Sequence, residues 1–329
     1  MRSHKPKSAM PDSLLRAVYT ALSPAGARAR LSTLIFHRVL TAPDPLLDDP
    51  TAEQFEQRMR WVQRHFNVLP LIEAVERLQG GTLPARALAI TFDDGYADNQ
   101  QIAAPILRTI GLPATFFIAT GFLDGGCMFN DSIIAAVRGC KRGALDLTEF
   151  GLGIHRLESI EQRRRAIAAL LPPLKILEPA LRADTAQRIC RSAEVAAPDD
   201  LMMTTSEVAA LARGGFGIGA HTVNHPILAR LEIDAACDEI ARGRSKLEQV
   251  IGGPVRLFAY PNGRPTDDYT GDTSEAVRKL GFDAAFTTAH GVAGCNADPF
   301  QLPRFTPWDR GDFKFGARMA RNLMHSFSA

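Results

Sequence analysis

Two adjacent carboxylates, Asp93 and Asp94, stand between a short apolar run and Gly95. The run, 87–92, is aliphatic and β-branched, which predicts a buried strand, and sites in α/β proteins gather at the carboxyl ends of such strands. Neighbouring residues of an extended chain point in opposite directions, but a turn begun by the glycine can bring both acids into one pocket. The same sequence is also common as a simple capped turn, and these residues alone do not separate the two interpretations.

Two histidines, His221 and His225, lie at the end of a second predicted strand. Four-residue spacing on a helix would point both imidazoles at one metal, but Pro226 disfavours a helix, so we expect a loop that can still bring the rings together. Two imidazoles and one carboxylate leave coordination positions open, as a hydrolytic metal centre needs. The alternative is two polar loop histidines that bind nothing.

Composition places the chain among ordinary globular proteins. Its 329 residues are 46% hydrophobic and 22% charged, enough to bury a large core. The formal charge of +2 and the lack of a basic stripe argue against a nucleic-acid partner. Five scattered cysteines predict free thiols. Without a signal-peptide pattern or a membrane-length apolar run, we expect a cytoplasmic protein, with peripheral contact to the inner membrane left open.

Strand and helix signals alternate along most of the chain, which predicts an α/β fold, specifically a distorted or incomplete (β/α) barrel. No dinucleotide or P-loop motif is present. Residues 125–206 break the alternation and predict a helical insertion, interrupted at Pro172-Pro173. Further strands are expected at 31–39, 66–70, 114–120, 215–222, 255–260, 284–288 and 301–305, and helices at 51–65, 71–78, 101–110, 233–250 and 273–280. The expected organisation is a mainly helical leader (1–30), a domain (31–310) and a tail (311–329).

Two motifs carry a resemblance to a known family. TFDDG at 91–95 together with HTVNH at 221–225 resembles the polysaccharide deacetylases, also called the NodB-homology group or carbohydrate esterase family 4. FAYPNG at 258–263 and LPR at 302–304 further resemble the branch that deacetylates exopolysaccharides built from N-acetylglucosamine. The resemblance covers 31–308. It implies a metal-dependent hydrolase that releases acetate from an acetylated amino-sugar glycan, with zinc as the default metal and nickel, cobalt and iron as alternatives.

The resemblance also implies roles for single residues. Asp93 matches the general base, and Asp94, His221 and His225 match the metal ligands. Tyr260 falls in the motif whose tyrosine usually offers a backbone N–H to the oxyanion.

Two features of the family pattern are missing. The arginine that usually begins the tyrosine motif is absent, so Arg304 is the candidate for orienting Asp93. The late Leu-x-His motif is also absent. A lone histidine at a strand end is more often structural, but in the exopolysaccharide branch the acid histidine comes from an N-terminal strand. His37 in FHRV therefore becomes the candidate general acid, with His290 as its rival.

Two alternatives from other classes remain open. The protein could be a catalytically silent glycan-binding subunit of a polysaccharide-export assembly, indifferent to Asp93→Asn. It could also be a metal-dependent amidohydrolase for a small or lipid-linked amino sugar, which the missing signal peptide favours. The sequence gives neither the glycan linkage nor the oligomeric state.

Overall fold

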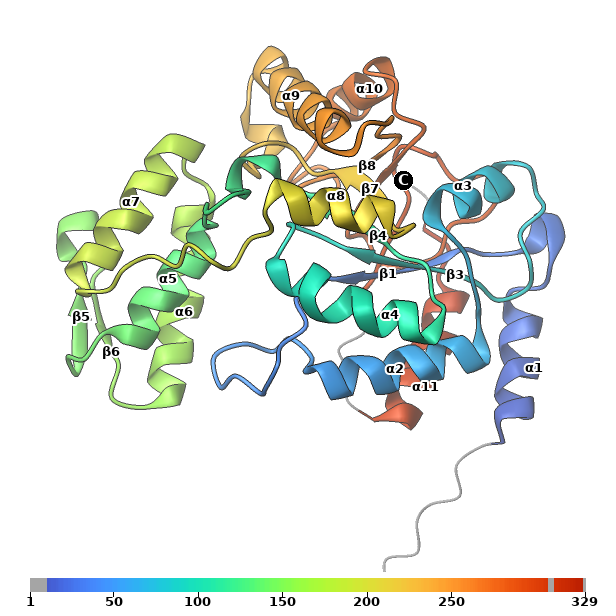
Figure 1. Cartoon of the computed structure of the whole chain (residues 1–329), viewed down its shortest axis with the longest axis horizontal. Helices are drawn as coiled ribbons and strands as arrows, with labels where there is room; N and C mark the ends of the chain where they lie inside the picture. The colour runs from blue at the N-terminus through green and yellow to red at the C-terminus, as the bar shows by residue number, and fades with distance from the viewer. Residues whose placement is uncertain (1–10, 307–310, 328–329) are drawn as a thin grey trace, which may run out of the picture.

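The computed structural model describes residues 11–306 and 311–327. Within these residues, seven parallel strands form one curved sheet (Figure 1) in the order β1-β3-β4-β7-β8-β9, with β2 also paired to β3. The strands are β1 (Ser32–Phe36), β2 (Asn67–Val68), β3 (Ala87–Phe92), β4 (Thr115–Ile118), β7 (Gly217–Ala220), β8 (Leu257–Ala259) and β9 (Ala284–Phe286). Residues 1–10 of the predicted leader, 307–310 of the predicted domain and 328–329 of the predicted tail lie outside the described residues.

A short closing segment, 302–305, lies between the edge strands β9 and β1. The Leu302 N–H donates to Ala285 O at 2.9 Å, and the Phe305 N–H donates to Thr33 O at 3.0 Å. These pairings are isolated bridges, so the last predicted strand is present only as single contacts. The molecule is an incomplete (β/α) barrel, and the predicted fold class is confirmed.

Helices cover the outside of the barrel. At the start of α2 the Thr51 hydroxyl accepts the Gln54 N–H and the Gln54 side chain accepts the Thr51 N–H, so the predicted capping box is confirmed. Adjacent Phe116 and Phe117 belong to different hydrophobic clusters because side chains alternate along β4, one under the helices and one inside the barrel. The helices are α2 (Ala52–His65), α3 (Leu71–Gln79), α4 (Ala104–Ile110), α8 (Thr205–Arg213), α9 (Ile233–Ile251) and α10 (Gly271–Lys279).

Residues 125–206 form an inserted lobe beside the barrel (Figure 1), with a hydrophobic core of its own. Helices dominate it, as predicted, but it also contains an antiparallel hairpin whose short strands leave no periodic pattern in the sequence. The predicted interruption at Pro172-Pro173 is wrong. The helix runs through both prolines because Leu170 and Leu174, on either side of them, are buried in the core of the lobe. The elements are α5 (Phe129–Gly139), β5 (Ala144–Asp146), β6 (Ile154–Arg156), α6 (Ile160–Lys175) and α7 (Pro179–Ser192).

The first and last helices pack against each other on the barrel. Helix α1 (Asp12–Leu22) contacts α2 and α11 (Asp312–Met324). Tyr19 is fully buried in this contact, and its hydroxyl donates to Gly316 O at 3.0 Å. No helix among the described residues is both long and apolar enough to span a bilayer. All five cysteines are free thiols, as predicted.

Candidate active site

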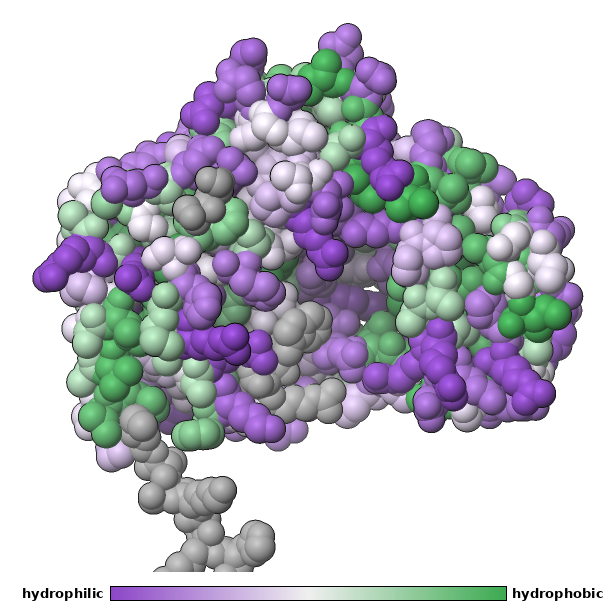
Figure 2. All heavy atoms as spheres, turned by 180° about the vertical axis from the view of Figure 1, so that it is seen from behind, coloured by the Kyte–Doolittle hydropathy of each residue, from purple (hydrophilic) through white to green (hydrophobic). Residues whose placement is uncertain are grey.

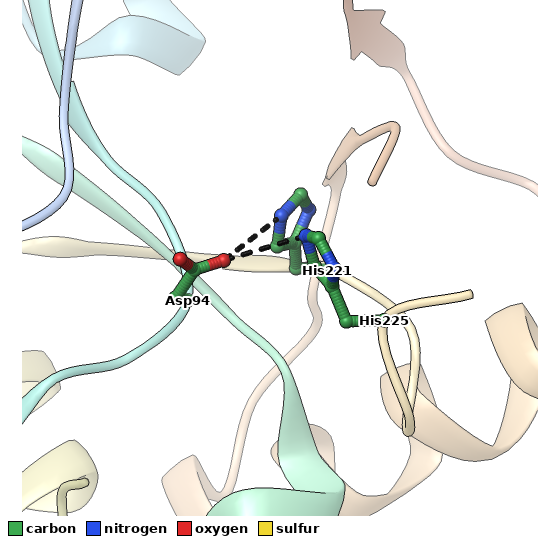
Figure 3. Close-up of side chains that lie close together, drawn as sticks. All are labelled: Asp94, His221 and His225. Carbon is green, nitrogen blue, oxygen red and sulfur yellow. Dashed lines mark ion pairs between the residues drawn. The ribbon is translucent and has the colours of Figure 1, made fainter. Parts of the chain in front are cut away.

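Asp94, His221 and His225 turn toward one point at the carboxyl ends of β3 and β7 (Figure 3). The Asp94 Oδ1 atom lies 3.5 Å from Nε2 of His221 and 3.5 Å from Nε2 of His225. A tetrahedral ion with ligands at about 2.0–2.1 Å separates its donor atoms by about 3.3 Å, so both distances suit a shared zinc-sized cation. All three ligand atoms lie within 4.8 Å of one another. The structure thus brings the three predicted metal ligands together.

The hydrogen bonding of this cluster fits a cation. Asp94 Oδ1 is buried without a hydrogen-bond partner, and such an acceptor needs a ligand to offset its desolvation. The Nδ1 atom of His221 lies 2.7 Å from Ala259 O, which can only accept, so Nδ1 carries the proton. In the neutral ring Nε2 then carries the lone pair and faces Asp94, as in metal sites whose histidines are oriented by a carbonyl.

Burial and neighbouring charges set the protonation of the cluster. Burial would raise the pKa of Asp94, but contact with His221 and the charges of both imidazoles hold the pKa below its ordinary value. Burial lowers the pKa of His225 to about 3, so this ring is neutral at pH 7. Burial would likewise lower the pKa of His221, but the negative charges of Asp93 and Asp94 outweigh burial and raise this pKa. The two shifts differ in sign because Asp93, Asp94 and the Ala259 carbonyl favour the charged form of His221, whereas the positive charges of His221 and Arg182 add to the effect of burial on His225.

Asp93 is held by a buried arginine. Nη1 of Arg304 donates to Oδ1 of Asp93 at 2.7 Å, and Nη2 donates to Oδ2 at 2.8 Å. Arg304 has no exposed surface, and its Nε donates to Thr287 O at 3.2 Å. Burial alone would raise the pKa of Asp93, but Arg304, together with His221 and His37, outweighs burial and lowers the pKa. The contact fixes the carboxylate as an oriented anion.

The alternation of β3 explains why Asp93 faces the barrel interior. Ala87 and Ala89 contribute to the cluster inside the barrel, so Thr91 and Asp93 continue the same face. The Thr91 hydroxyl lies 3.2 Å from Nη1 of Arg304, which comes in from the closing segment. Asp93 and its arginine therefore meet because a buried strand and the closing segment present their inner faces to each other.

The two candidate general acids lie in different places. His37 follows β1 directly, and its charge helps to lower the pKa of both Asp93 and Asp94. Exposed His290 instead borders a hollow of about 280 Å³ whose other lining residues include Phe305 and residues of α11. His37 is therefore the histidine that acts on the acid pair, and its role as general acid stays a prediction.

Tyr260 does not have the geometry expected for its predicted role. Its backbone N–H donates to Phe286 O at 3.1 Å, and its hydroxyl donates to Phe300 O at 2.9 Å. Its ring is fully buried and stacks on Tyr269 at 3.8 Å between centroids. The prediction is corrected, because an N–H that pairs with Phe286 of β9 is not free to bind an oxyanion.

Asn262 is a residue that the sequence analysis missed. It follows β8 at the carboxyl end of the sheet, with φ of 62°, and its side-chain amide nitrogen is buried without a partner. A Pro-Asn-Gly sequence directly after a predicted strand is a turn signal that could have drawn attention to it. The amide nitrogen is therefore an unsatisfied hydrogen-bond donor beside the end of β8.

The inserted lobe also reaches the site. The Tyr96 hydroxyl donates to Oδ2 of Asp131 in α5 at 3.0 Å, and burial raises the pKa of Asp131 to about 7. Figure 2 shows the molecule hollowed between the barrel and the lobe, with hydrophilic residues along the hollow. Nothing in the sequence pattern predicts this contact, because it depends on how the lobe folds back.

Barrel, acid pair and histidine pair together define a class of proteins, the polysaccharide deacetylases. Residues 80–144 and 183–285 match this family, so the chain belongs to it and the predicted membership is confirmed. The match leaves out 145–182, which falls within the inserted lobe.

Individual relatives carry more specific names. YxkH of Bacillus subtilis (strain 168), which is named among the polysaccharide deacetylases, is 24% identical over 278 residues, 84% of this chain and 71% of that protein. The poly-beta-1,6-N-acetyl-D-glucosamine N-deacetylase of Staphylococcus aureus (strain MSSA476) is 29% identical over 114 residues, 34% of this chain and 39% of that enzyme. The solved structure of IcaB from Ammonifex degensii has a TM-score of 0.57 at 18% identity, over 92% of this chain and 99% of that chain. This last likeness concerns the fold alone.

Proposed function

We propose that this protein is a metal-dependent deacetylase that hydrolyses N-acetyl groups of an N-acetylglucosamine-containing polysaccharide. The observation that carries the proposal is the ionised, arginine-held Asp93 beside the cluster of Asp94, His221 and His225. An oriented carboxylate and a hydrolytic metal site are the two parts that amide hydrolysis by water requires.

The divalent ion would be held by Asp94, His221 and His225. We propose zinc, because imidazole and carboxylate are its usual ligands. Nickel, cobalt and iron bind the same ligand types and remain alternatives. When bound, such an ion supplies Lewis acidity toward the amide carbonyl and toward water. Asp93 accepts a proton from the attacking water, while Arg304 keeps its two oxygens in place and ionised.

The amine can leave only if its nitrogen gains a proton. His37, on the same side of the barrel as the two acids, is the group that we propose donates it. The C–O bond to the water oxygen forms, the C–N bond breaks, and the products are acetate and an amino sugar. The buried amide of Asn262 is a candidate donor to the developing oxyanion, in place of Tyr260.

We propose further that the substrate is a polymer. The S. aureus relative is named for a poly-N-acetylglucosamine substrate, and the hollow beside the inserted lobe is open on the face seen in Figure 2. A catalytically silent glycan-binding role is less suited to this site. Replacing a buried ion pair by apolar residues is often neutral or stabilising, so binding alone gives no reason to keep Asp93 paired with Arg304.

The test measures acetate release from N-acetylglucosamine and from its short oligomers by zinc-loaded wild type, Asp93→Asn and Asp184→Asn. Asp93→Asn removes the base and leaves the three metal ligands. Asp184→Asn is the matched control, because Asp184 lies on an exposed face of α7. We expect release from oligomers by wild type and the control only.

Each of the other outcomes would contradict a different part of the proposal. Release from the monosaccharide but not from oligomers would replace the polymer by a small amino-sugar amide. No release by zinc-loaded wild type would refute the deacetylase, and equal release by Asp93→Asn would refute the assignment of the base.

A further inference from the structure

The loop that carries His225 has a backbone that needs support. Thr222 and His225 have φ values of 64° and 51°, in the left-handed region that residues with a side chain rarely adopt. The His225 N–H donates to the Thr222 hydroxyl at 3.1 Å, which is a contact within the loop. Such conformations persist where the surrounding structure fixes them.

The barrel holds one side of this loop. The Gly121 N–H donates to Val223 O at 2.8 Å. The Glu239 carboxylate in α9 accepts the Val223 N–H at 3.0 Å and the Asn224 N–H at 2.8 Å. These contacts fix the loop before His225 but leave the carbonyls of Asn224 and His225 to another partner.

That partner comes from the inserted lobe. Nη2 of Arg182 in α7 donates to Asn224 O at 2.8 Å and to His225 O at 3.2 Å. Arg182 is only 4% exposed, and its guanidinium lies over the ring of Phe129 at 4.9 Å, so the side chain is held in one place. A guanidinium is suited to this task because its donors lie in a rigid plane.

The lobe also holds the segment that carries the acid ligand. The Met203 N–H donates to Gly95 O at 2.9 Å, next to Asp94, and Asp131 accepts the Tyr96 hydroxyl. Both chain segments that supply metal ligands are thus fastened to the same lobe, at different elements.

We infer that Arg182 is a positioning residue for the metal centre: from the inserted lobe it fixes the backbone of Asn224 and His225 and so aims Nε2 of His225 at the ion. The inference rests on the metal site of the proposed function. It gives the lobe, part of which lies outside the family match, a role in metal binding.

The test measures zinc affinity in the absence of substrate, by competition with a chromogenic chelator. Arg182→Met removes the donors and keeps the stem, and Arg188→Met is the matched control. Arg188 lies on the same helix, exposed, over the ring of Phe150 at 4.7 Å. We expect Arg182→Met to bind zinc about ten- to a hundredfold more weakly, as other losses of ligand-supporting contacts do, and Arg188→Met to match wild type.

A double-mutant cycle separates positioning from general damage to the lobe. If Arg182 acts through His225, Arg182→Met will cost no further zinc affinity in the His225→Ala background. A loss of equal size in that background would overturn the inference, as would wild-type affinity in Arg182→Met alone. Circular dichroism of the zinc-free proteins checks that both variants fold. If Arg182→Met does not fold, Arg182→Lys, with one donor nitrogen, takes its place and should bind zinc more weakly than wild type; wild-type affinity in Arg182→Lys would then overturn the inference.

These results are independent of the acetate assay. Weak zinc binding by Arg182→Met together with no acetate release by wild type would leave the positioning role standing and refute the deacetylase. Acetate release by wild type together with unchanged zinc affinity in Arg182→Met would support the deacetylase and refute the positioning role of Arg182.

Discussion

Arg304 and Asp93 are 211 residues apart in the chain, yet each carboxylate oxygen of Asp93 meets its own guanidinium nitrogen, at 2.7 and 2.8 Å. The arginine reaches the acid from the closing segment, not from the end of β8 where the family motif usually places it. The ionisation of the proposed base therefore depends on the closure of the barrel.

Replacing Arg304 by Met should destabilise the protein and raise the pKa of Asp93. Removing one partner of a buried ion pair costs about 3–5 kcal/mol. Arg304 holds the pKa of Asp93 below its ordinary value, so its loss should move the acid limb of the kcat/KM profile to higher pH. Urea unfolding and a pH–rate profile measure the two effects.

Arg256→Met is the control for this substitution. Arg256 pairs with Glu76 and Asp283 at the surface, where an ion pair contributes about 0–1 kcal/mol. Because the folded pKa of Asp93 is depressed, its pairing stabilises the fold above the unfolded value of about 3.9 and less as the pH falls below it. Equal destabilisation by both substitutions, or an unmoved acid limb, would contradict the prediction.

His37→Gln should lower kcat by about a hundred- to ten-thousandfold, the usual contribution of a general acid. His290→Gln should leave kcat unchanged, because His290 is exposed and lines a different hollow. Steady-state acetate release measures both. The reverse ranking would make His290 the acid.

Metal removal should lower the melting temperature of wild type more than that of His225→Ala. A ligand that binds only the folded state stabilises it by about 2.7 kcal/mol at a hundred times its Kd. The two Nε2 atoms lie 3.5 Å from the same oxygen of Asp94, so losing one imidazole removes a third of the ligand set. Thermal melts with added zinc and with added chelator provide the measurement, and an equal zinc-induced shift in His225→Ala would argue against the proposed ligands.

Asp131→Asn should flatten the pH dependence of stability. Burial raises the pKa of Asp131 from 3.8 to about 7, so the folded state binds more protons than the unfolded state between these values. Stability due to the protonated acid is complete below the unfolded pKa and is lost as the pH rises toward 7. Urea unfolding of the zinc-free proteins at pH 5 and pH 7.5 should show a smaller difference for Asp131→Asn, which can still accept the Tyr96 hydroxyl. An unchanged difference would mean that another group titrates.

Tyr260→Phe should keep catalytic activity and cost about 0.5–1.5 kcal/mol of stability, because it removes the hydrogen bond to Phe300 O. Parallel acetate assays and urea unfolding check this. A large fall in kcat without a matching loss of stability would restore Tyr260 to the site.

The parts of the site that follow from strand ends could be predicted from the sequence. Asp93, Asp94 and His221 come directly after buried strands, and the carboxyl ends of parallel strands meet at one edge. His225 follows from its four-residue spacing to His221, and the resemblance to the family added Arg304 to this set.

The predictions that failed concern features that depend on contacts between distant segments of the chain. The backbone N–H of Tyr260 pairs with Phe286 O, and only the register of β8 and β9 decides that. Arg182 and Asp131 come from the lobe, and their helical spacing says nothing of the loops they meet. The helix through Pro172 depends on the core of the lobe, which overrides local preference.

The single bridges at Leu302 and Phe305 also imply an order of folding events during synthesis. During synthesis Asp93 emerges more than two hundred residues before the segment that carries its counter-charge. Until that segment docks, the nascent barrel contains an unneutralised carboxylate that resists burial. A ribosome-bound chain that ends before residue 302 would therefore contain most of the sheet and still lack the contact that orients Asp93, so the last step of folding would also be the one that fixes the proposed base.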